Sequence, residues 1–262
     1  MEKAWRLILD KKHGGYYNMA VDEAILQGYS CYKTPTLRIY GWDEPFFSLG
    51  YNQSPQEIFN PDNAIPFVRR MTGGSAILHD QEITYSLVCS RGDLGLSGTV
   101  KESYQNLCSF IKDFYFQLGL RALFAKDALN NNLGKYSDFC FSSCQHFDLM
   151  LDGKKIGGNA QRRRKDLIFQ HGSIPQKIDF STIKSSVKKI ENIEYLTTCL
   201  DQALGKSSDF YNLQSLLAKS FKLSFAIKLI QSRLFAEEAA MAKRLLETKY
   251  NSTSWNFYNA KI

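Results

Sequence analysis

Residues 69–86, with the sequence RRMTGGSAILHDQEITYS, decide the fold of this chain. Arg69 and Arg70 precede a turn that carries Gly73 and Gly74, and alternating, strand-like runs follow the turn. This pattern predicts a strand, a glycine turn and a second strand. Because glycine has no Cβ, a ligand can approach the backbone of such a turn closely, and exposed N–H groups there favour anionic or carbonyl oxygens. Taken alone, the segment also fits an ordinary hairpin with a solvated arginine pair.

The overall composition limits the classes of protein to which the chain can belong. Its 262 residues are 44% hydrophobic and 23% charged, which is typical of a globular protein with a sizeable core. No apolar run approaches the roughly 20 residues of a membrane span, and the N-terminal run is too short for a signal peptide. We therefore expect a cytoplasmic protein that does not bind membranes. The net charge of +7 would suit nucleic acid, a membrane surface or an acidic protein; no nucleic-acid-binding motif accompanies it, and an acidic protein partner stays open.

The six cysteines follow no disulfide framework, and in a cytoplasmic protein we expect them to be reduced. Cys140 and Cys144 form a CxxxC pair close to His146. No second pair stands at metal-ligand spacing, so no metal site is predicted.

Strand patterns dominate the first half of the chain and helical patterns the second, which predicts an α+β fold. We expect a first helix over residues 19–27, with Asn18 as its N-cap and Gly28 at its end. A capping box, Thr99-x-x-Glu102, predicts a second, core-facing helix that ends at Gly119. The expected strands cover residues 5–9, 36–40, 46–49, 147–151, 155–162, 167–174 and 223–230, with a hairpin turn at Asp152-Gly153.

A second stretch, residues 140–172, reads CFSSCQHFDLMLDGKKIGGNAQRRRKDLIFQHG. Together with the first stretch, the segment PTLRIYGW…FSLGYNQ and the closing YNSTSWN, it resembles the lipoate–protein ligase A and octanoyltransferase superfamily, which is related to the biotin ligases. The resemblance runs from about Pro35 to Ile174. It implies a mixed β-sheet flanked by helices, with a catalytic domain over residues 1–222 and a C-terminal helical tail, 223–262, packed on the same domain.

The resemblance also implies an acyl chain bound in a tunnel beside the glycine turn. Lys155, in the GKK motif, would contact the acyl carbonyl, where a cation stabilises the developing oxyanion; without the family pattern it could equally be an exposed hairpin lysine. The substrate-binding residues that the resemblance implies are Arg69, Arg70, Thr72, Gly73, Gly74, Ala76, His79, Gly158 and Ala160.

The motif from His79 to Ser86 separates the branches of this family. The ATP-dependent ligases carry an HD-x-GN form, whereas this chain has Glu82 and resembles the HD-x-EL-TYS form of the cysteine-dependent octanoyltransferases. Cys140 stands thirteen residues before Gly153, where that branch has its nucleophile. The chain departs from the branch pattern between Ser143 and Phe147, so Cys144 is a rival nucleophile, as in a related amidotransferase branch.

The expected reaction is octanoyl transfer from an acyl carrier protein, through a thioester on Cys140, to a lysine of a lipoyl-domain protein such as glycine cleavage H protein. A thiolate attacks thioesters readily, and a nearby lysine lowers its pKa. No cofactor is expected, and ATP and magnesium would be needed only by the alternative, a lipoate–protein ligase. A further alternative is a family member that binds acyl groups without turnover.

Overall fold

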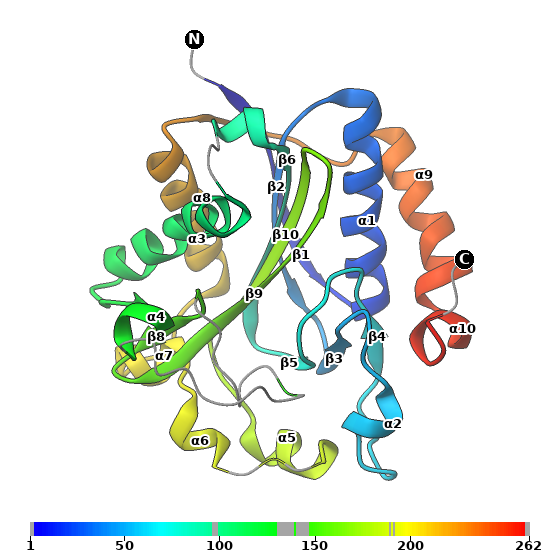
Figure 1. The fold of residues 1–262 in the computed structure, drawn as a ribbon, viewed down its shortest axis with the longest axis vertical. Helices are drawn as coiled ribbons and strands as arrows, with labels where there is room; N and C mark the ends of the chain where they lie inside the picture. Colours follow the sequence, from blue (N-terminus) through cyan, green and yellow to red (C-terminus); the bar gives the residue numbers. More distant parts are fainter. Residues whose placement is uncertain are drawn as a thin grey trace.

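The fold is known from a computed structural model that describes residues 3–95, 99–129, 139, 147–188, 190 and 192–259. Figure 1 shows a central sheet with helices on both faces, which confirms the predicted α+β class. The large sheet has eight strands in the order β11-β1-β2-β6-β10-β9-β8-β7, and a small sheet has three strands in the order β4-β3-β5. None of the described helices is long and apolar enough to cross a membrane.

Most of the expected strands and helices are present in the structure. The strands are β1 (Ala4–His13), β2 (Thr36–Trp42), β3 (Phe46–Leu49), β4 (Phe67–Arg69), β5 (Ile77–His79), β6 (Glu82–Ser90), β7 (Leu123–Phe124), β8 (Leu149–Leu151), β9 (Lys154–Arg164), β10 (Leu167–Pro175) and β11 (Lys228–Gln231). The helices are α1 (Gly15–Tyr32), α2 (Pro55–Ile58), α3 (Val100–Gln117), α4 (Ala125–Ala128), α5 (Phe180–Ser186), α6 (Ile193–Leu196), α7 (Leu200–Leu204), α8 (Phe210–Phe225), α9 (Ala236–Leu245) and α10 (Thr253–Asn256). A 3-10 turn covers Arg91–Leu94, and a π-helical turn, Leu246–Tyr250, extends α9.

The large sheet is mixed because β1 runs parallel to both of its neighbours, β11 and β2, while the other pairs are antiparallel. Its centre is the long ladder of β6, β10 and β9, in which the β6–β10 pairing runs from Leu167↔Ser90 to Pro175↔Glu82. The predicted turn at Asp152-Gly153 joins β8 to β9, and both residues have positive φ, as a tight hairpin requires.

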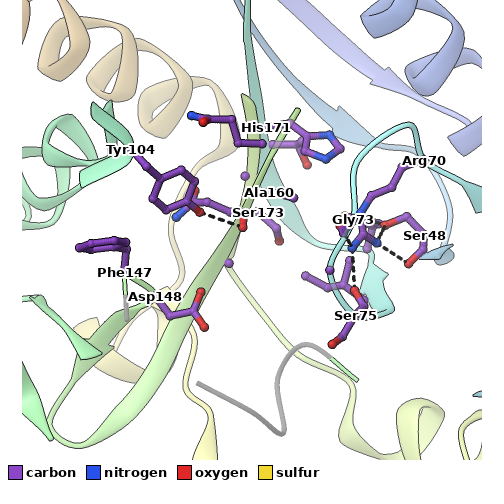
Figure 2. Close-up of a pocket in the computed structure, with 18 of the residues that line it drawn as sticks. Ser48, Arg70, Gly73, Ser75, Tyr104, Phe147, Asp148, Ala160, His171 and Ser173 are labelled. Carbon is purple, nitrogen blue, oxygen red and sulfur yellow. Dashed lines mark hydrogen bonds between the residues drawn. The ribbon is translucent and has the colours of Figure 1, made fainter. Parts of the chain in front are cut away.

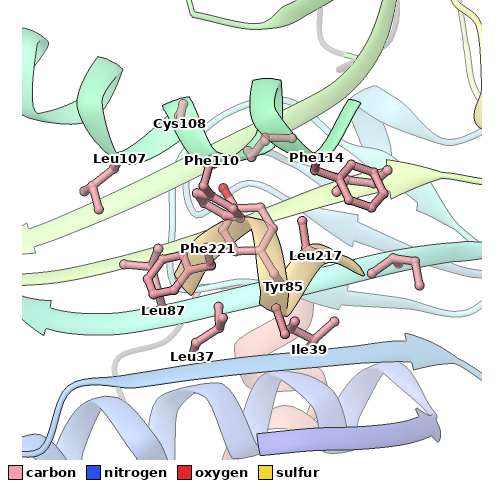
Figure 3. Close-up of a cluster of buried hydrophobic side chains, with 14 of the residues drawn as sticks. Leu37, Ile39, Tyr85, Leu87, Leu107, Cys108, Phe110, Phe114, Leu217 and Phe221 are labelled. Atoms are coloured by element: carbon pink, nitrogen blue, oxygen red, sulfur yellow. The ribbon is translucent and has the colours of Figure 1, made fainter. Parts of the chain in front are cut away.

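The main core lies between the large sheet and helices α3 and α8, as Figure 3 shows. Alternate residues of β2 and β6 point to these helices, because successive side chains of a strand face opposite sides of the sheet. The buried residues that meet there include Leu37, Ile39, Tyr85, Leu87, Leu107, Phe110, Phe114, Leu217 and Phe221. Each large side chain buried in this way contributes about 1.5–3 kcal/mol relative to exposure. The capping box that starts α3 is confirmed, since Thr99 and Glu102 cap each other.

The first helix differs from its prediction at both ends. It begins at Gly15, and Asn18 is buried inside it, donating to the carbonyls of His13 and Gly41 instead of capping. It also continues past Gly28 to Tyr32. A Cβ on Gly28 would lie 2.9 Å from Glu238 Oε1 of α9, so this glycine permits close packing of two helices and does not end one.

The glycine turn does not join two paired strands. The strands on either side of it, β4 and β5, both pair with β3, which lies between them. The predicted order of strand, glycine turn and strand is present, but the turn crosses the end of the small sheet, so the alternative of an ordinary hairpin is excluded. The strand that follows β5 is β6, which belongs to the large sheet. Residues 69–86 therefore connect the two sheets.

The C-terminal part of the chain packs against the N-terminal part. Strand β11 pairs with β1, and α9 lies against α1 (Figure 1). Arg6 of β1 donates to both carboxylate oxygens of Glu238, at 2.8 and 2.6 Å, in a buried pair. Helix α8 continues across residue 222, and the division into a catalytic domain and a tail stays a prediction.

Candidate active site

A cavity of about 920 Å³ lies between the glycine turn and the strands β9 and β10. In Figure 2, Arg70, Gly73 and Ser75 stand on one side of it, and Tyr104, Phe147 and Asp148 on the other. The predicted site residues that line it are Arg70, Gly73, Gly74, His79, Lys155, Gly158 and Ala160. Arg69, Thr72 and Ala76 are not among the lining residues, and Cys140 and Cys144 lie outside the described residues.

Arg70 holds the glycine turn in shape. Its guanidinium is buried and donates to the carbonyl oxygens of Ser48 (3.0 Å), Gly73 (2.8 Å) and Ser75 (2.8 Å). It also donates to the hydroxyls of Ser48 and Thr72, at 3.2 Å each. The planar guanidinium can satisfy several acceptors at fixed angles, so Arg70 fixes the cavity wall.

The other arginine, Arg69, points away from the cavity. Its side chain donates to the carbonyls of Gly50, Tyr51 and Gln53 and to those of Trp255 and Asn256 near the C-terminus. The Trp255 indole N–H and the Asn256 amide oxygen bond in turn to the Arg69 backbone, at 2.8 and 2.9 Å. Arg69 therefore joins the turn to the end of the chain, and the expectation of a cation at the mouth of the turn is wrong for this residue.

A hydrogen-bonded group centred on His79 forms one buried wall. His79 Nε2 lies 2.8 Å from Ser48 Oγ, and His79 Nδ1 lies 2.9 Å from Glu82 Oε1. Ser173 of β10 donates to the second oxygen of Glu82 at 2.6 Å. The Trp42 ring stacks on the imidazole, with centroids 4.0 Å apart and planes 6° from parallel. These contacts connect the small sheet to the large sheet and hold His79 in one orientation.

A second group connects the turn to β10 and α1. His171 Nε2 lies 2.8 Å from the Thr72 hydroxyl, and its Nδ1 faces the buried Asp22 at 3.9 Å. Burial, opposed by the hydrogen-bonding and charge effects of Asp22, lowers the pKa of His171. The imidazole is therefore neutral near pH 7, and since Arg70 donates to the Thr72 oxygen, Thr72 can donate its proton to His171. Thr72 thus positions the turn from outside the cavity.

Asp22 is itself held ionised by its neighbours. Burial alone would raise its pKa, but the hydrogen bond to His171 and the charge of Arg38 outweigh this effect and lower the pKa. Arg38 donates to Asp22 at 2.9 Å, and the hydroxyls of Tyr40 and Ser86 donate at 2.9 and 2.7 Å. A buried carboxylate of this kind persists only when it is paired and hydrogen-bonded.

Lys155 is buried in the cavity wall, 2% exposed, and its Nζ donates to Asp148 Oδ2 at 2.6 Å. Lys155 lies on β9, and Asp148 immediately precedes β8. The antiparallel pairing of β8 and β9 brings the two side chains together. The pair excludes the exposed hairpin lysine that the sequence left open. It places an ammonium group in a buried part of the cavity wall, where electrostatic stabilisation is stronger than in water.

Sequence reasoning did not identify His171, Asp148 and Ser173 as site residues, and it used Glu82 only to separate branches. Their roles depend on contacts between strands that are distant in the sequence. His171 and Ser173 alternate on β10 and face the cavity, a period-two signal that could have linked them to a common face. Among the described residues, no cluster of histidine, cysteine and acidic side chains is arranged to hold a metal ion.

The fold is that of the lipoate–protein ligases. A crystal structure of lipoate–protein ligase A bound with ATP matches with a TM-score of 0.81 at 22% identity, covering 98% of this chain and 99% of that one. The putative lipoate protein ligase Ta0514 of Thermoplasma acidophilum, solved with bound lipoic acid, matches with a TM-score of 0.79 at 23% identity, covering 98% and 100%.

The sequence comparisons identify the family. Residues 14–222 match the model of the lipoyl protein ligase A/B catalytic domain, and the chain belongs to this family. It is 33% identical to the octanoyltransferase LipM of Brevibacillus brevis, over 96% of this chain and 98% of that protein. It is 34% identical to the Kyrpidia tusciae protein and 31% identical to the Bacillus subtilis protein of the same name, over 97–98% of this chain and 99% of each relative.

Gly73 is a better position than Gly74 for a substitution that tests the cavity wall. A Cβ there would meet no atom within 4 Å, whereas one on Gly74 would lie 3.0 Å from Arg70 on a backbone with φ of +90°. We expect Gly73→Val to fold normally but to weaken acyl binding about 10- to 100-fold, because the added side chain occupies space at the wall. Gly74→Val should lose both stability and binding. Thermal unfolding and octanoate binding by calorimetry measure the two effects, and unchanged binding in Gly73→Val would show that the turn does not contact the acyl group.

The lowered pKa of His171 predicts how stability depends on pH. The unfolded chain takes up a proton on this histidine below about pH 6.5, whereas the folded chain resists it until lower pH. The stabilisation is therefore complete above about pH 6.5 and is lost as the pH falls toward the folded-state pKa. Chemical unfolding between pH 5 and 7.5 should show a smaller acidic loss in His171→Gln than in the wild type. Equal slopes would mean that His171 does not resist protonation.

Proposed function

We propose that this chain transfers an octanoyl group from the thioester of an acyl carrier protein to the ε-amine of a lysine on a lipoyl-domain protein, through a thioester on Cys140. The relatives named octanoyltransferase LipM, which match nearly end to end at 31–34% identity, support an acyltransferase of lipoate biosynthesis. A related archaeal structure is described as a bipartite lipoate protein ligase and its E2 lipoyl domain, which supports the acceptor class.

One observation supports Cys140 in particular. Phe139, the residue directly before it, is buried and forms a parallel bridge with Ala76, two residues beyond Gly74. Consecutive Cα atoms are about 3.8 Å apart, so the covalent chain attaches Cys140 to a residue paired beside the glycine turn. Ala76 is not among the lining residues of the cavity, and this bridge gives it a structural role instead.

The four described cysteines are poor candidates for the nucleophile. Burial raises the pKa of the Cys108 thiol to about 12 and raises those of Cys89 and Cys199. Cys31 is exposed but is not among the lining residues. Because the thiolate is the reactive form, these residues are unsuited to attack a thioester in the cavity, which leaves Cys140 and its rival Cys144.

The proposed reaction has two steps. The Cys140 thiolate attacks the octanoyl carbonyl, the bond to the carrier sulfur breaks, and the carrier leaves as a thiol after taking up a proton. The neutral lysine amine of the acceptor then attacks the enzyme thioester, an amide forms, the amine loses a proton, and the Cys140 thiolate is released. Both steps pass through an oxyanion, and neither needs ATP, because a thioester is already activated.

Lys155 is suited to stabilise that oxyanion. Its ammonium group is enclosed in the cavity wall, and Asp148 fixes its direction through a 2.6 Å bond. Transfer in buffer without ATP or magnesium tests the proposed class, since strict dependence on both with free lipoate would indicate a ligase.

The nucleophile can be assigned by mass spectrometry of the intact protein. After incubation with octanoyl-acyl carrier protein, the wild type and Cys144→Ala should gain the mass of one octanoyl group, and Cys140→Ala should not. Octanoylation that is lost only in Cys144→Ala would favour the amidotransferase branch. An adduct in both variants would exclude both cysteines.

Lys155 can be separated from its structural role with a double variant. Lys155→Met alone removes the ammonium group that bonds to the buried Asp148 carboxylate, which should cost about 3–5 kcal/mol of stability. Lys155→Met with Asp148→Asn removes both charges and should recover much of that stability, while kcat stays lower by about 10²–10³ because the oxyanion lacks its cation. Recovery of both stability and kcat in the double variant would show that the pair is only structural.

A further inference from the structure

The cavity is larger than an octanoyl group requires. That group has eight carbons and one oxygen, which occupy roughly 270 Å³ if each heavy atom takes the about 30 Å³ of a liquid water. The cavity measures about 920 Å³. More than half of it is therefore available to another part of a substrate.

The lining residues divide into a buried part and an exposed part. On the side of the small sheet, Trp42, Ser48 and His79 are buried beneath the glycine turn. On the side of α3, Lys101 is exposed and Arg163 is partly exposed. We call the part lined by Lys101, Tyr104, Phe147 and Arg163 the entrance.

Two aromatic rings form the walls of the entrance. Tyr104 and Phe147 have ring centroids 5.7 Å apart, and Figure 2 shows both on the side of the cavity away from Arg70. The Tyr104 hydroxyl donates to the Asn159 carbonyl at 3.0 Å, which ties α3 to β9. The Lys101 ammonium lies 5.9 Å from the Phe147 ring. Walls of this kind suit a slender, partly apolar chain.

The charge of the entrance is positive. Among the described lining residues, Arg70, Lys101, Lys155 and Arg163 are cationic and Asp148 is the acidic residue. Asp148 is bonded to Lys155, and Arg70 is bonded to the glycine turn. The cationic residues of the entrance itself are Lys101 and Arg163.

The surroundings of this pair add to the positive potential. Arg163 donates to the neutral groups Ser103 Oγ and Gln161 Oε1, at 2.7 and 2.5 Å, which hold its guanidinium against α3. Burial and the charge of Arg91 lower the pKa of Arg163, so a second cation is close. Lys101 stands in the first turn of the 18-residue helix α3, whose N-terminal dipole favours anions. Glu102, in the same turn, has its carboxylate bonded to Thr99.

We propose that Lys101 and Arg163 bind the phosphate of the donor's pantetheine arm, while Tyr104 and Phe147 contact the arm itself. The proposal rests on the proposed function, because a carrier-protein thioester is linked to its protein through a phosphate ester. Arginine and lysine are the side chains that recognise phosphate, and a partly enclosed entrance strengthens the interaction relative to water. The phosphate would hold the donor so that its thioester reaches past the entrance to Lys155.

Two small donors test this inference without a carrier protein. S-octanoyl-phosphopantetheine carries the phosphate, and S-octanoyl-pantetheine lacks it. The wild type should have a KM about tenfold lower for the phosphorylated donor, with similar kcat. Lys101→Gln should raise the KM for the phosphorylated donor about tenfold and leave the KM for the other donor unchanged, since only binding is lost. Arg163→Gln should show the same selectivity.

Lys112→Gln is the matched control. Lys112 is on the same helix and lies over a phenylalanine ring, that of Phe124, at 5.1 Å, but it is not among the lining residues. The Lys112→Gln variant should show the same difference in KM between the two donors as the wild type. Raised salt should reduce the preference of the wild type for the phosphorylated donor, because exposed charges are screened.

The outcomes separate the inference from the proposed function. Transfer from both donors with equal KM in the wild type would overturn the inference and leave the octanoyltransferase in place. An effect of Lys101→Gln that appears only with the whole carrier protein would also overturn it, since the lysine would then contact the protein surface. No transfer from these donors or from octanoyl-acyl carrier protein would overturn the proposed function together with the inference.

Discussion

The hydrogen bonds of the two adjacent arginines are the constraint on which the site depends. Arg70 binds the carbonyls of the glycine turn and of β3, and Arg69, directed to the opposite side, binds carbonyls near both the turn and the C-terminus. Backbone carbonyls that are buried without a partner cost about 1–3 kcal/mol each, so neither side chain can leave without loosening the turn. The glycine turn is not part of a β-ladder, so the hydrogen bonds of these two side chains fix its shape.

These bonds explain why an apparently cationic motif forms a largely neutral wall. The charge of Arg70 is directed at carbonyl oxygens, and His171 stays neutral because burial lowers its pKa. The walls beneath the turn can therefore accept an uncharged acyl chain. The other cationic lining residues are Lys155, which is paired with Asp148, and Lys101 and Arg163 at the entrance.

The sequence was sufficient to predict the α+β class, the family and most of the central strands, because strand alternation and the ordered motifs are local signals. It predicted that Arg70, Gly73, His79 and Lys155 share one site, and all four line the same cavity, while their roles stay a prediction. It could not predict that Arg69 faces the other way, since two neighbouring arginines at the end of β4 give no sign of which side chain faces the cavity. The prediction that Gly28 ends the first helix was wrong for a similar reason. The glycine is needed there for close packing against Glu238, which lies on a helix distant in the sequence.

The contact between Arg69 and Asn256 spans 187 residues of sequence. Contacts of such separation form late, because a long loop must close before any bond compensates for the lost chain entropy. During synthesis, β4, which leads into the glycine turn, can therefore complete its contacts only after residues near the other end of the chain have been made. The same holds for β1, which pairs with β11. A nascent chain that ends before Trp255 and Asn256 would lack the bonds that hold Arg69 and the strand before the glycine turn. The cavity wall would then be complete only when synthesis is nearly finished, an order of events set by topology.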